Sequence, residues 1–268
     1  MPGAARIMEP DLDAFRALMT ARGWVRFPTQ VPAPLLADLR HDLDEAYRKW
    51  RAMQLRNGVG AGTDGTLHHL AGRGTSVDAF LASLPLHPAI SAFFEADRYI
   101  LNACGGFLNL PASETYVGRV HRDVRGFSGD YPILVNMLVM LDDFTEENGA
   151  SWMLTGSHRL PERPSDDLFF AHAERNTGRA GDVVLFDSHL WHCAGVNRTP
   201  APRRALTISY SRPFVKPQMD YAGLATPEVI ETYGEPMRQL LGLNAGVPRS
   251  VDAYYQPPER RAYRADQG

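Results

Sequence analysis

From Glu114 to Asp123 the chain reads ETYVGRVHRD, a stretch rich in strand-forming residues that ends in an imidazole and a carboxylate two positions apart. Side chains alternate between the two faces of a strand, so residues i and i+2 point the same way. We therefore predict that Thr115–His121 is a strand and that His121 and Asp123 project together. One histidine and one acid are only part of a metal site, so a third ligand must come from elsewhere.

A second histidine cluster follows the apolar run DVVLF at Asp182–Phe186. His189 and His192 both compete for the third ligand position, and they face opposite ways on an extended segment because they are three residues apart. We choose His192, which is followed by Gly195 and Asn197, and expect His189 to pack nearby. Two histidines and one carboxylate on one side of a metal form the facial triad of non-haem Fe(II) oxygenases.

Short strand patterns separated by turn residues dominate the middle of the chain, which favours an antiparallel sandwich or barrel. Besides Thr115–His121, the expected strands are Tyr99–Leu108, Ile133–Leu141, Ser151–Leu154, Asp182–Phe186 and Ala205–Ser211. With no repeat and no linker in the sequence, we predict a single domain over residues 1–268. It would comprise a helical lead-in with a lid loop (1–98), a β core (99–213) and a C-terminal extension (214–268).

The lead-in and the extension carry the expected helices. Periodic apolar residues predict helices at Asp11–Arg22, from Pro34 onward, at Val77–Leu84, at Ala89–Ala96 and at Glu228–Leu241, and a short strand at Trp24–Phe27. The glycine-rich stretch Asn57–Gly74 reads as a loop and carries His68 and His69. A loop of this length is typical of lids, so we expect one of these histidines near a bound substrate.

Composition is that of an ordinary globular enzyme: 268 residues, 44% hydrophobic and 22% charged. The formal net charge of -3, without a basic block, argues against a nucleic-acid partner. No run approaches the roughly 18 apolar residues of a membrane span, and Met1–Pro10 lacks a signal-peptide core. Two cysteines do not make a disulfide scaffold, so we expect a cytoplasmic location. The sequence does not indicate an oligomeric state.

Three protein ligands leave three positions on an octahedral Fe(II), enough for a bidentate co-substrate and O2. The common bidentate partner is 2-oxoglutarate, whose distal carboxylate needs a fixed cation such as arginine. Arg203 and Arg204 both follow His192, but adjacent residues on a strand point to opposite faces. We choose Arg203, because Thr207 and Ser209 share its face and are polar.

Five ordered blocks together resemble the phytanoyl-CoA dioxygenase family of Fe(II)- and 2-oxoglutarate-dependent oxygenases. They are His121–Asp123, Glu147–His158, Gly181–Phe186, His192–Asn197 and Arg203–Leu206, somewhat under half the chain. The resemblance implies a mainly β protein with flanking helices around a double-stranded β-helix (jelly-roll) core. It also implies that His121, Asp123 and His192 bind iron and that Arg203 binds the far carboxylate of 2-oxoglutarate. One departure is Thr155, where the family usually has proline.

The reaction that this resemblance implies is hydroxylation of an unidentified small molecule, with release of succinate and CO2. Halogenating relatives replace the carboxylate ligand by a small residue, so Asp123 favours hydroxylation. Two other interpretations stay open: a jelly-roll protein that binds a ligand without turnover, and a hydrolase that uses Zn2+.

Several further residues are candidates for the same site. Asn136 is polar within an apolar strand, so it either hydrogen-bonds the co-substrate or substrate or satisfies a buried backbone group. We expect Trp152 and Thr207 to line the co-substrate pocket, although core packing also explains Trp152. Arg119 shares the face of His121 if the strand is regular, where it would clamp an anionic substrate group; the alternative is a surface ion pair.

Overall fold

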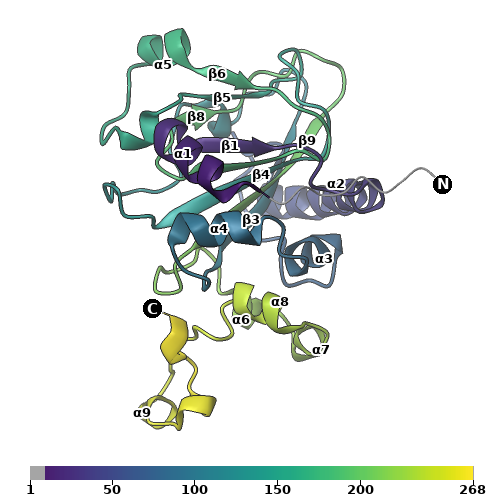
Figure 1. Ribbon diagram of the computed structural model, residues 1–268. Coiled ribbons are helices and arrows are strands. Elements are labelled where there is room, and N and C mark those ends of the chain that lie inside the picture. The colour runs from purple at the N-terminus through teal and green to yellow at the C-terminus, as the bar shows by residue number, and fades with distance from the viewer. Residues whose placement is uncertain (1–9, 268) are drawn as a thin grey trace, which may run out of the picture.

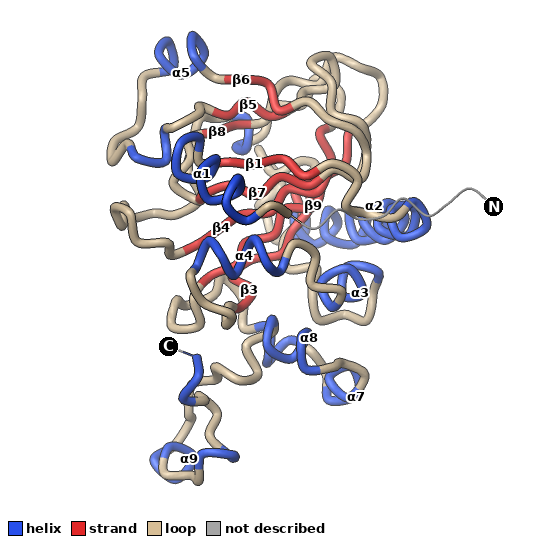
Figure 2. The backbone as a smooth tube through the Cα atoms, viewed as in Figure 1, coloured by secondary structure: helices blue, strands red, loops and turns tan. Residues whose placement is uncertain are grey.

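Two antiparallel sheets form the centre of the protein, and helices flank the larger one (Figure 1). The computed structural model describes residues 10–267. The N-terminal segment Met1–Pro10, in which we expect no signal peptide, lies almost wholly outside the described residues. In the view of Figure 2, the smaller sheet lies above the larger one and the C-terminal helices lie below it.

The larger sheet contains the strands that carry most of the predicted core pattern. Its spatial order is β1 (Trp24–Phe27), β7 (Val183–Asp187), β4 (Leu134–Met140), β9 (Arg203–Ser211), β3 (Ile100–Asn109) and β2 (Thr66–Leu67). Every neighbouring pair is antiparallel. The first and last strands come from the lead-in, so the segment before residue 99 completes both edges of this sheet.

The smaller sheet supplies the opposing layer. Its strands, in spatial order, are β6 (Glu174–Asn176), β5 (Ser151–Met153) and β8 (His192–Cys193). Leu138, Met140 and Phe186 of the larger sheet pack with Met153 of the smaller one in a single buried cluster. This cluster fills the space between the two layers.

The remaining regular structure of the described residues consists of helices and short helical turns. The lead-in carries α1 (Leu12–Arg22), α2 (Ala33–Arg56), α3 (Ser76–Ala82) and α4 (His87–Phe94). The core adds η1 (Tyr116–Gly118), η2 (Ser157–Arg159) and α5 (Asp166–His172). The extension carries α6 (Tyr221–Leu224), α7 (Pro227–Glu231), α8 (Glu235–Leu240), α9 (Val251–Tyr254), η3 (Pro258–Arg260) and η4 (Ala265–Gln267).

The ends of the first two helices follow from their sequences. Asp11 caps α1 by accepting hydrogen bonds from the backbone N–H groups of Asp13 and Ala14, and Gly23 ends it with φ +79°. Pro34 lies in the first turn of α2, where its missing N–H costs nothing. Leu36, Leu39 and Leu43 fall on one stripe of α2 and are buried against the sheet.

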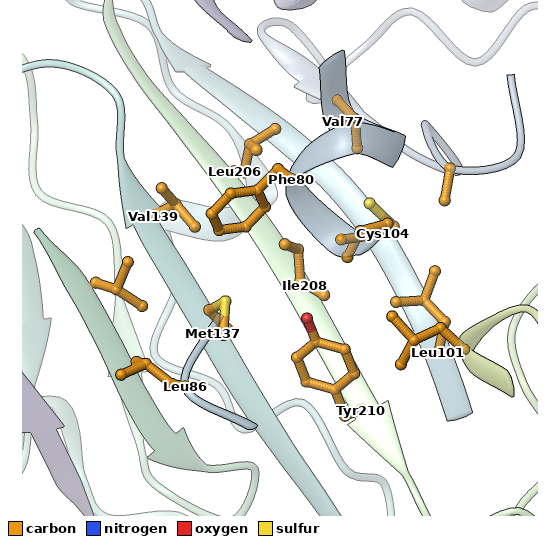
Figure 3. Close-up of a cluster of buried hydrophobic side chains, with 14 of the residues drawn as sticks. Val77, Phe80, Leu86, Leu101, Cys104, Met137, Val139, Leu206, Ile208 and Tyr210 are labelled. Atoms are coloured by element: carbon orange, nitrogen blue, oxygen red, sulfur yellow. The ribbon is translucent and has the colours of Figure 1, made fainter. Parts of the chain in front are cut away.

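Strand β9 shows how one alternating sequence serves both faces of the larger sheet. Leu206, Ile208 and Tyr210 point to the helical side, where Figure 3 shows them beside Met137 and Val139 of β4. Their neighbours Ala205, Thr207 and Ser209 point to the other side and line a cavity. The helix-side cluster runs from Phe15 in α1 to Leu241 after α8. This continuity supports the single-domain organisation that we propose for the chain.

Two predicted elements are wrong. Thr115–His121 is not a strand: residues 116–118 form the turn η1, and only His121 makes an isolated bridge, to His192. The predicted helix at Glu228–Leu241 is divided into α7 and α8. Pro236 explains the break, because its ring clashes with the preceding turn inside a helix and is tolerated only in the first turn, where α8 has it.

The loop expected at Asn57–Gly74 also contains a strand, since Thr66 and Leu67 pair with Phe107 and Gly106 as β2. Among residues 10–267, no single helix has the length and apolar character to cross a membrane. The bent pair α3 and α4, at 64° to each other, passes that test of length and composition only when the two are taken together.

Candidate metal centre and cofactor pocket

His121 and His192 face each other across a two-residue bridge. The backbone N–H of His121 donates to the carbonyl of His192 over 3.0 Å, and the N–H of His192 returns a bond of 2.9 Å to the carbonyl of His121. Their ring centroids are 4.4 Å apart. The backbone pairing therefore brings together two imidazoles that are far apart in the sequence.

Asp123 completes the cluster. Its backbone N–H donates to the carbonyl of Ser188 over 3.1 Å. Its carboxylate oxygens lie 3.6 Å from Nε2 of His121 and 3.7 Å from Nε2 of His192. All three ligand atoms lie within 4.8 Å of one another. Because ligand bonds to first-row metals are roughly 2 Å long, one ion between these atoms can contact all three.

Hydrogen bonds set the orientation of both imidazoles. Nδ1 of His121 donates to the carbonyl of Arg119 over 2.7 Å, and Nδ1 of His192 donates to the carbonyl of Leu190 over 2.9 Å. Each ring therefore presents the lone pair of Nε2 toward Asp123, the form in which histidine binds metal. Burial, with a smaller effect of His121, lowers the pKa of His192 to about 4, although Asp123 opposes the shift. The neutral ring suits a ligand role.

Asn136 on β4 holds the carboxylate. Its Nδ2 donates to Asp123 Oδ2 over 2.7 Å, while its Oδ1 accepts from the Ser209 hydroxyl over 2.6 Å. Asn136 is buried at 3% exposure, so both ends of its amide need partners. The side chain lines the cavity, but these contacts orient Asp123.

The metal cluster opens into a cavity of about 220 Å³. Its lining comes from β2, β3, β4, β5, β7, β8, β9 and the turn η1. The three ligands lie in its wall together with Asn136 and Ser209. The donor set fits iron: two imidazoles and one carboxylate occupy one side, and the cavity leaves room on the other for a chelating co-substrate.

Arg203 lies at the start of β9, on the same face as the cavity-lining Ala205 and Thr207. It is 2% exposed, and among the described residues its Nε and Nη1 have no hydrogen-bond partner. Its guanidinium carbon is 3.8 Å from the centre of the Phe144 ring. Burial lowers the pKa of Arg203 to about 9, with Asp142 opposing the shift. A buried cation with unused donors is a site to which a carboxylate would bind favourably.

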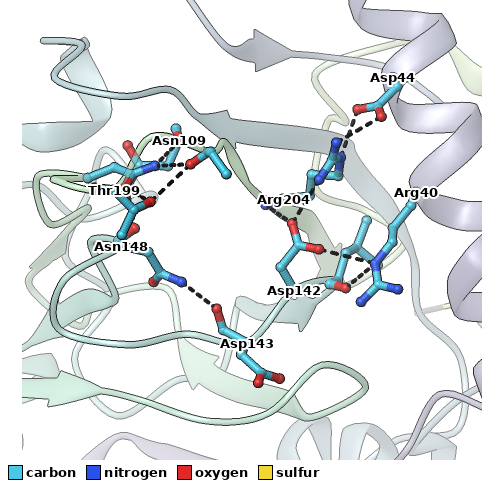
Figure 4. A network of polar contacts seen from close by, with 11 residues as sticks. Arg40, Asp44, Asn109, Asp142, Asp143, Asn148, Thr199 and Arg204 are labelled. Carbon is cyan, nitrogen blue, oxygen red and sulfur yellow. Dashed lines mark hydrogen bonds and ion pairs between the residues drawn. The ribbon is translucent and has the colours of Figure 1, made fainter.

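Arg204 forms ion pairs with two other residues (Figure 4). Its Nε and Nη2 donate to the two carboxylate oxygens of Asp44 on α2, at 2.8 and 3.0 Å. Its Nη1 and backbone N–H both donate to Asp142 Oδ2, which is 3.2 and 2.8 Å away. Asp142 in turn pairs with Arg40 over 3.1 Å. This network anchors the start of β9 against α2, so the alternation of the strand turns Arg203 to the opposite face.

Two predicted pocket residues lie elsewhere. Trp152 points away from the cavity, because its neighbours Ser151 and Met153 occupy the inner face of β5. Its ring packs under the guanidinium of Arg175, 3.8 Å away, and against Phe170. The side chain of Arg119 is exposed and does not line the cavity. The turn η1 breaks the alternation on which that expectation depended, and only the backbone carbonyl of Arg119 contacts His121.

The two loop histidines, His68 and His69, make different contacts, and only the first lines the cavity. His68 lines the cavity, and its Nε2 shares a hydrogen bond of 3.0 Å with the hydroxyl of Tyr116. His69 adopts φ +60° and places its Nδ1 3.2 Å from the hydroxyl of Tyr221. His69 is not part of the cavity wall.

Sequence reasoning missed Tyr116 and Gln218, which both line the cavity. Tyr116 lies in the segment that we incorrectly predicted as a strand. Gln218 lies in the polar extension, where no sequence pattern indicates a site residue. The sequence also did not indicate the hydrogen-bond partners of His189. His189 is 2% exposed and bridges Asp187 Oδ1, 2.8 Å from its Nδ1, to Ser128, whose N–H donates to Nε2 over 3.2 Å.

Comparison with known proteins decides the family. A sequence profile of the phytanoyl-CoA dioxygenase (PhyH) family matches residues 20–205, which is more than half of the chain. The chain belongs to the phytanoyl-CoA dioxygenase family. This confirms the resemblance seen in the five sequence blocks, which is to a family of iron- and 2-oxoglutarate-dependent dioxygenases. Fe(II), 2-oxoglutarate and O2 are the cofactor and co-substrates of that class.

Curated members of the phytanoyl-CoA dioxygenase family include both unassigned and named relatives. The Mycobacterium tuberculosis protein Rv1501, which has no assigned function, is 33% identical over 179 residues, covering 65% of each chain. The iron/alpha-ketoglutarate-dependent dioxygenase penM of Penicillium thymicola is 30% identical over 145 residues, 49% of this chain and 45% of that one. The matched region thus spans less than two thirds of these relatives.

Solved structures confirm the fold expected of a phytanoyl-CoA dioxygenase relative. EctD from S. alaskensis, crystallised with 2-oxoglutarate and 5-hydroxyectoine, aligns with a TM-score of 0.62 over 78% of each chain at 18% identity. At this identity the likeness supports the architecture alone. The antiparallel jelly-roll core with flanking helices is therefore as predicted.

Proposed function

We propose that the protein is an Fe(II)- and 2-oxoglutarate-dependent dioxygenase that hydroxylates a small molecule and releases succinate and CO2. The observation that carries this proposal is the convergence of His121, Asp123 and His192 within 4.8 Å in the wall of a cavity. The wall continues along β9 to the face that carries the buried, unpaired Arg203.

Each of these side chains has a defined task. His121, Asp123 and His192 hold the iron through Nε2, a carboxylate oxygen and Nε2. Arg203 binds the distal carboxylate of 2-oxoglutarate, with Thr207 beside it on the cavity face of β9. When bound, the iron supplies the oxidising chemistry that couples decarboxylation of 2-oxoglutarate to hydroxylation of the substrate. The apolar wall around these groups excludes water.

The orienting residues act one step away from the metal. Asn136 fixes one carboxylate oxygen of Asp123, and Ser209 fixes the amide of Asn136. The carbonyls of Arg119 and Leu190 fix the two imidazoles. These contacts restrict the three ligand side chains to positions that face one ion, which lowers the entropic cost of binding it.

Oxygen uptake and succinate formation test the proposal. Protein reconstituted anaerobically with Fe(II) should consume O2 and form succinate from 2-oxoglutarate when air is admitted. Zn2+ in place of Fe(II) should support neither. Asp123→Ala should abolish hydroxylation, because one of three metal ligands is removed. Turnover of a hydrolysable substrate with Zn2+, without succinate, would instead favour a hydrolase, and metal binding without any turnover would favour a ligand-binding protein.

We propose a reducing, cytoplasmic setting for this reaction. Cys104 and Cys193 are both buried and free, and burial raises the pKa of each thiol, to about 12 for Cys193. Thiols in this state behave as core residues and not as a disulfide pair. The partner is a small-molecule substrate.

A further inference from the structure

The cavity wall contains polar side chains that neither hold the metal nor lie on the Arg203 face of β9. Three of them are His68 beside β2, Tyr116 in η1, and Gln218 at the start of the C-terminal extension. These three groups come from the lead-in, the core and the extension. A substrate that reaches the metal through this cavity passes along the wall that carries them.

His68 and Tyr116 form a pair whose members are both uncharged at neutral pH. The hydroxyl of Tyr116 lies 3.0 Å from Nε2 of His68. Both side chains are partly exposed, Tyr116 at 42%, so the pair borders solvent. Burial of the rest of the ring, reinforced by the charge of Asp123, raises the pKa of Tyr116, so its phenol stays protonated. Burial lowers the pKa of His68, which favours the neutral imidazole. The phenol oxygen can donate one hydrogen bond and accept others, so the pair has capacity for a ligand.

The position of His68 is built into the fold. Leu67 pairs with Gly106, and a Cβ on Gly105 would lie 2.4 Å from the carbonyl oxygen of Leu67. Only glycine at 105 lets the backbone before His68 approach β3 this closely. The indole N–H of Trp50 donates to the carbonyl of His68 over 2.7 Å. The imidazole is therefore held against the cavity by backbone contacts that do not involve its ring.

His69 is turned away from the cavity by equally specific contacts. Its φ of +60° is unusual for a residue with a side chain. The hydroxyl of Tyr221 accepts a hydrogen bond from the N–H of Cys104 over 2.7 Å and lies 3.2 Å from Nδ1 of His69. Tyr221 is 2% exposed. The C-terminal extension thus holds His69 through a buried tyrosine, so two adjacent histidines have different surroundings.

The charge of the wall limits what can enter. Among residues 10–267, no Lys or Arg lines this cavity, and Asp123, a proposed metal ligand, is its one carboxylate. In the proposed complex the charges of Fe(II) and Arg203 are already balanced by Asp123 and the two carboxylates of 2-oxoglutarate. A further anionic group would therefore lose its hydration without gaining an unpaired cationic partner, which is costly. A hydroxyl or carbonyl group would lose less, and it could bond to Tyr116 and His68.

We propose that the part of the substrate that enters this cavity is uncharged and carries a hydroxyl or carbonyl group that hydrogen-bonds to the Tyr116–His68 pair. This inference rests on the proposed function, because it concerns the substrate of the same site. It assigns specificity to His68 and Tyr116 and gives His69 no contact with the substrate.

Matched probes test the charge preference. Each carbon skeleton is offered to the Fe(II) protein with 2-oxoglutarate and O2 in an uncharged form and an anionic form: an amide against the carboxylate, and an alcohol against its phosphate ester. We expect succinate release above the substrate-free rate with uncharged members, and at least about tenfold less stimulation by their anionic partners. Equal or greater stimulation by the anionic members would overturn the proposal. The proposal would also be overturned if no uncharged probe in the panel stimulated succinate release.

Adjacent variants test the residue assignment. With a responding probe, His68→Ala and Tyr116→Phe should each raise KM by roughly tenfold, as expected for a lost hydrogen bond. His69→Ala should change KM by less than about twofold. Equal effects of His68→Ala and His69→Ala would contradict the assignment.

Anaerobic Fe(II) and 2-oxoglutarate give a visible chelate band, which all three variants should retain. Absence of that band from the wild-type protein would overturn the proposed function and this inference with it. A normal band together with a preference for anionic probes would overturn only the inference.

Discussion

Asn136 donates a hydrogen bond of 2.7 Å to one carboxylate oxygen of Asp123. The two side chains come from separate segments, β4 and the stretch after η1, and the bond links the larger sheet to the metal cluster. Ser209 on β9 extends the contact, because its hydroxyl donates to the other end of the Asn136 amide. The position of the carboxylate is therefore set by two adjacent strands of the sheet.

Removing this link should weaken metal binding. Mutating a residue that hydrogen-bonds to a metal ligand typically weakens metal binding by about 10- to 100-fold. We expect Asn136→Ala to raise the Kd for Fe(II), or for Co2+ as a stable substitute, within that range in anaerobic titrations. Ser209→Ala should have a smaller effect in the same direction, because it leaves the Asn136–Asp123 bond intact. An unchanged Kd in Asn136→Ala would mean that the amide does not position the ligand.

The two neighbouring arginines should separate co-substrate binding from stability. Losing one partner of a buried charge pair costs about 3–5 kcal/mol, so Arg203→Met should raise the Kd for 2-oxoglutarate by at least about 100-fold. Metal affinity should stay unchanged. Without 2-oxoglutarate, the variant should be as stable as the wild type or more so, because a buried unpaired cation has been replaced by an apolar side chain.

Arg204→Met is the matched control for that prediction. It removes the ion pairs to Asp44 and Asp142, so thermal unfolding should occur at a lower temperature. Its Kd for 2-oxoglutarate should stay within a few-fold of the wild-type value. The reverse pattern, with Arg204→Met abolishing 2-oxoglutarate binding and Arg203→Met leaving it intact, would refute the assignment.

His189 should stabilise the loop that follows Asp123. It connects Asp187 to Ser128, while the N–H groups of Asp123 and Val124 donate to the carbonyl of Ser188. This resembles a hydrolytic Ser-His-Asp arrangement. However, the imidazole is 2% exposed, and the Ser128 hydroxyl donates to the carbonyl of Tyr131. The contacts are those of a buried tie between two segments.

Replacing His189 should therefore destabilise the segment that follows the metal ligand Asp123, although His189 itself is outside the metal site. Leaving the partners of a buried imidazole unpaired costs about 1–3 kcal/mol, so we expect His189→Ala to lower the free energy of unfolding by that amount in urea. Amide hydrogen exchange of residues 124–131 should become faster. His172→Ala, at an exposed position, is the control and should change neither quantity. Unaltered exchange in His189→Ala would show that the tie is not needed.

Alternation along strands is the rule behind the choice between the two neighbouring arginines. The choice of Arg203 over Arg204 used only the period of two, and the side chains of β9 do alternate between the cavity and the helical core. The same rule failed for Arg119, because Gly118 lies in a turn and not in a strand. His121 and Asp123 still converge, since each is hydrogen-bonded to the segment around His192.

Other features depended on contacts between distant segments. Sequence patterns predicted Trp152 in the pocket. However, β5 is so short that pairing with β6 and β8 decides which of its side chains point into the cavity. The separation of His68 from His69 depends on Tyr221 and on the lack of a side chain at Gly105. No local pattern around residues 57–74 carries that information, because both partners lie in other parts of the chain.

The visible spectrum of the anaerobic protein tests the central claim most directly. With Fe(II) and 2-oxoglutarate, the wild-type protein should develop a weak charge-transfer band, because the keto acid chelates iron held by the three side chains. His192→Ala should lose the band at the same concentrations. A wild-type protein without the band, or a His192→Ala variant with a full band, would contradict the assignment of the metal centre.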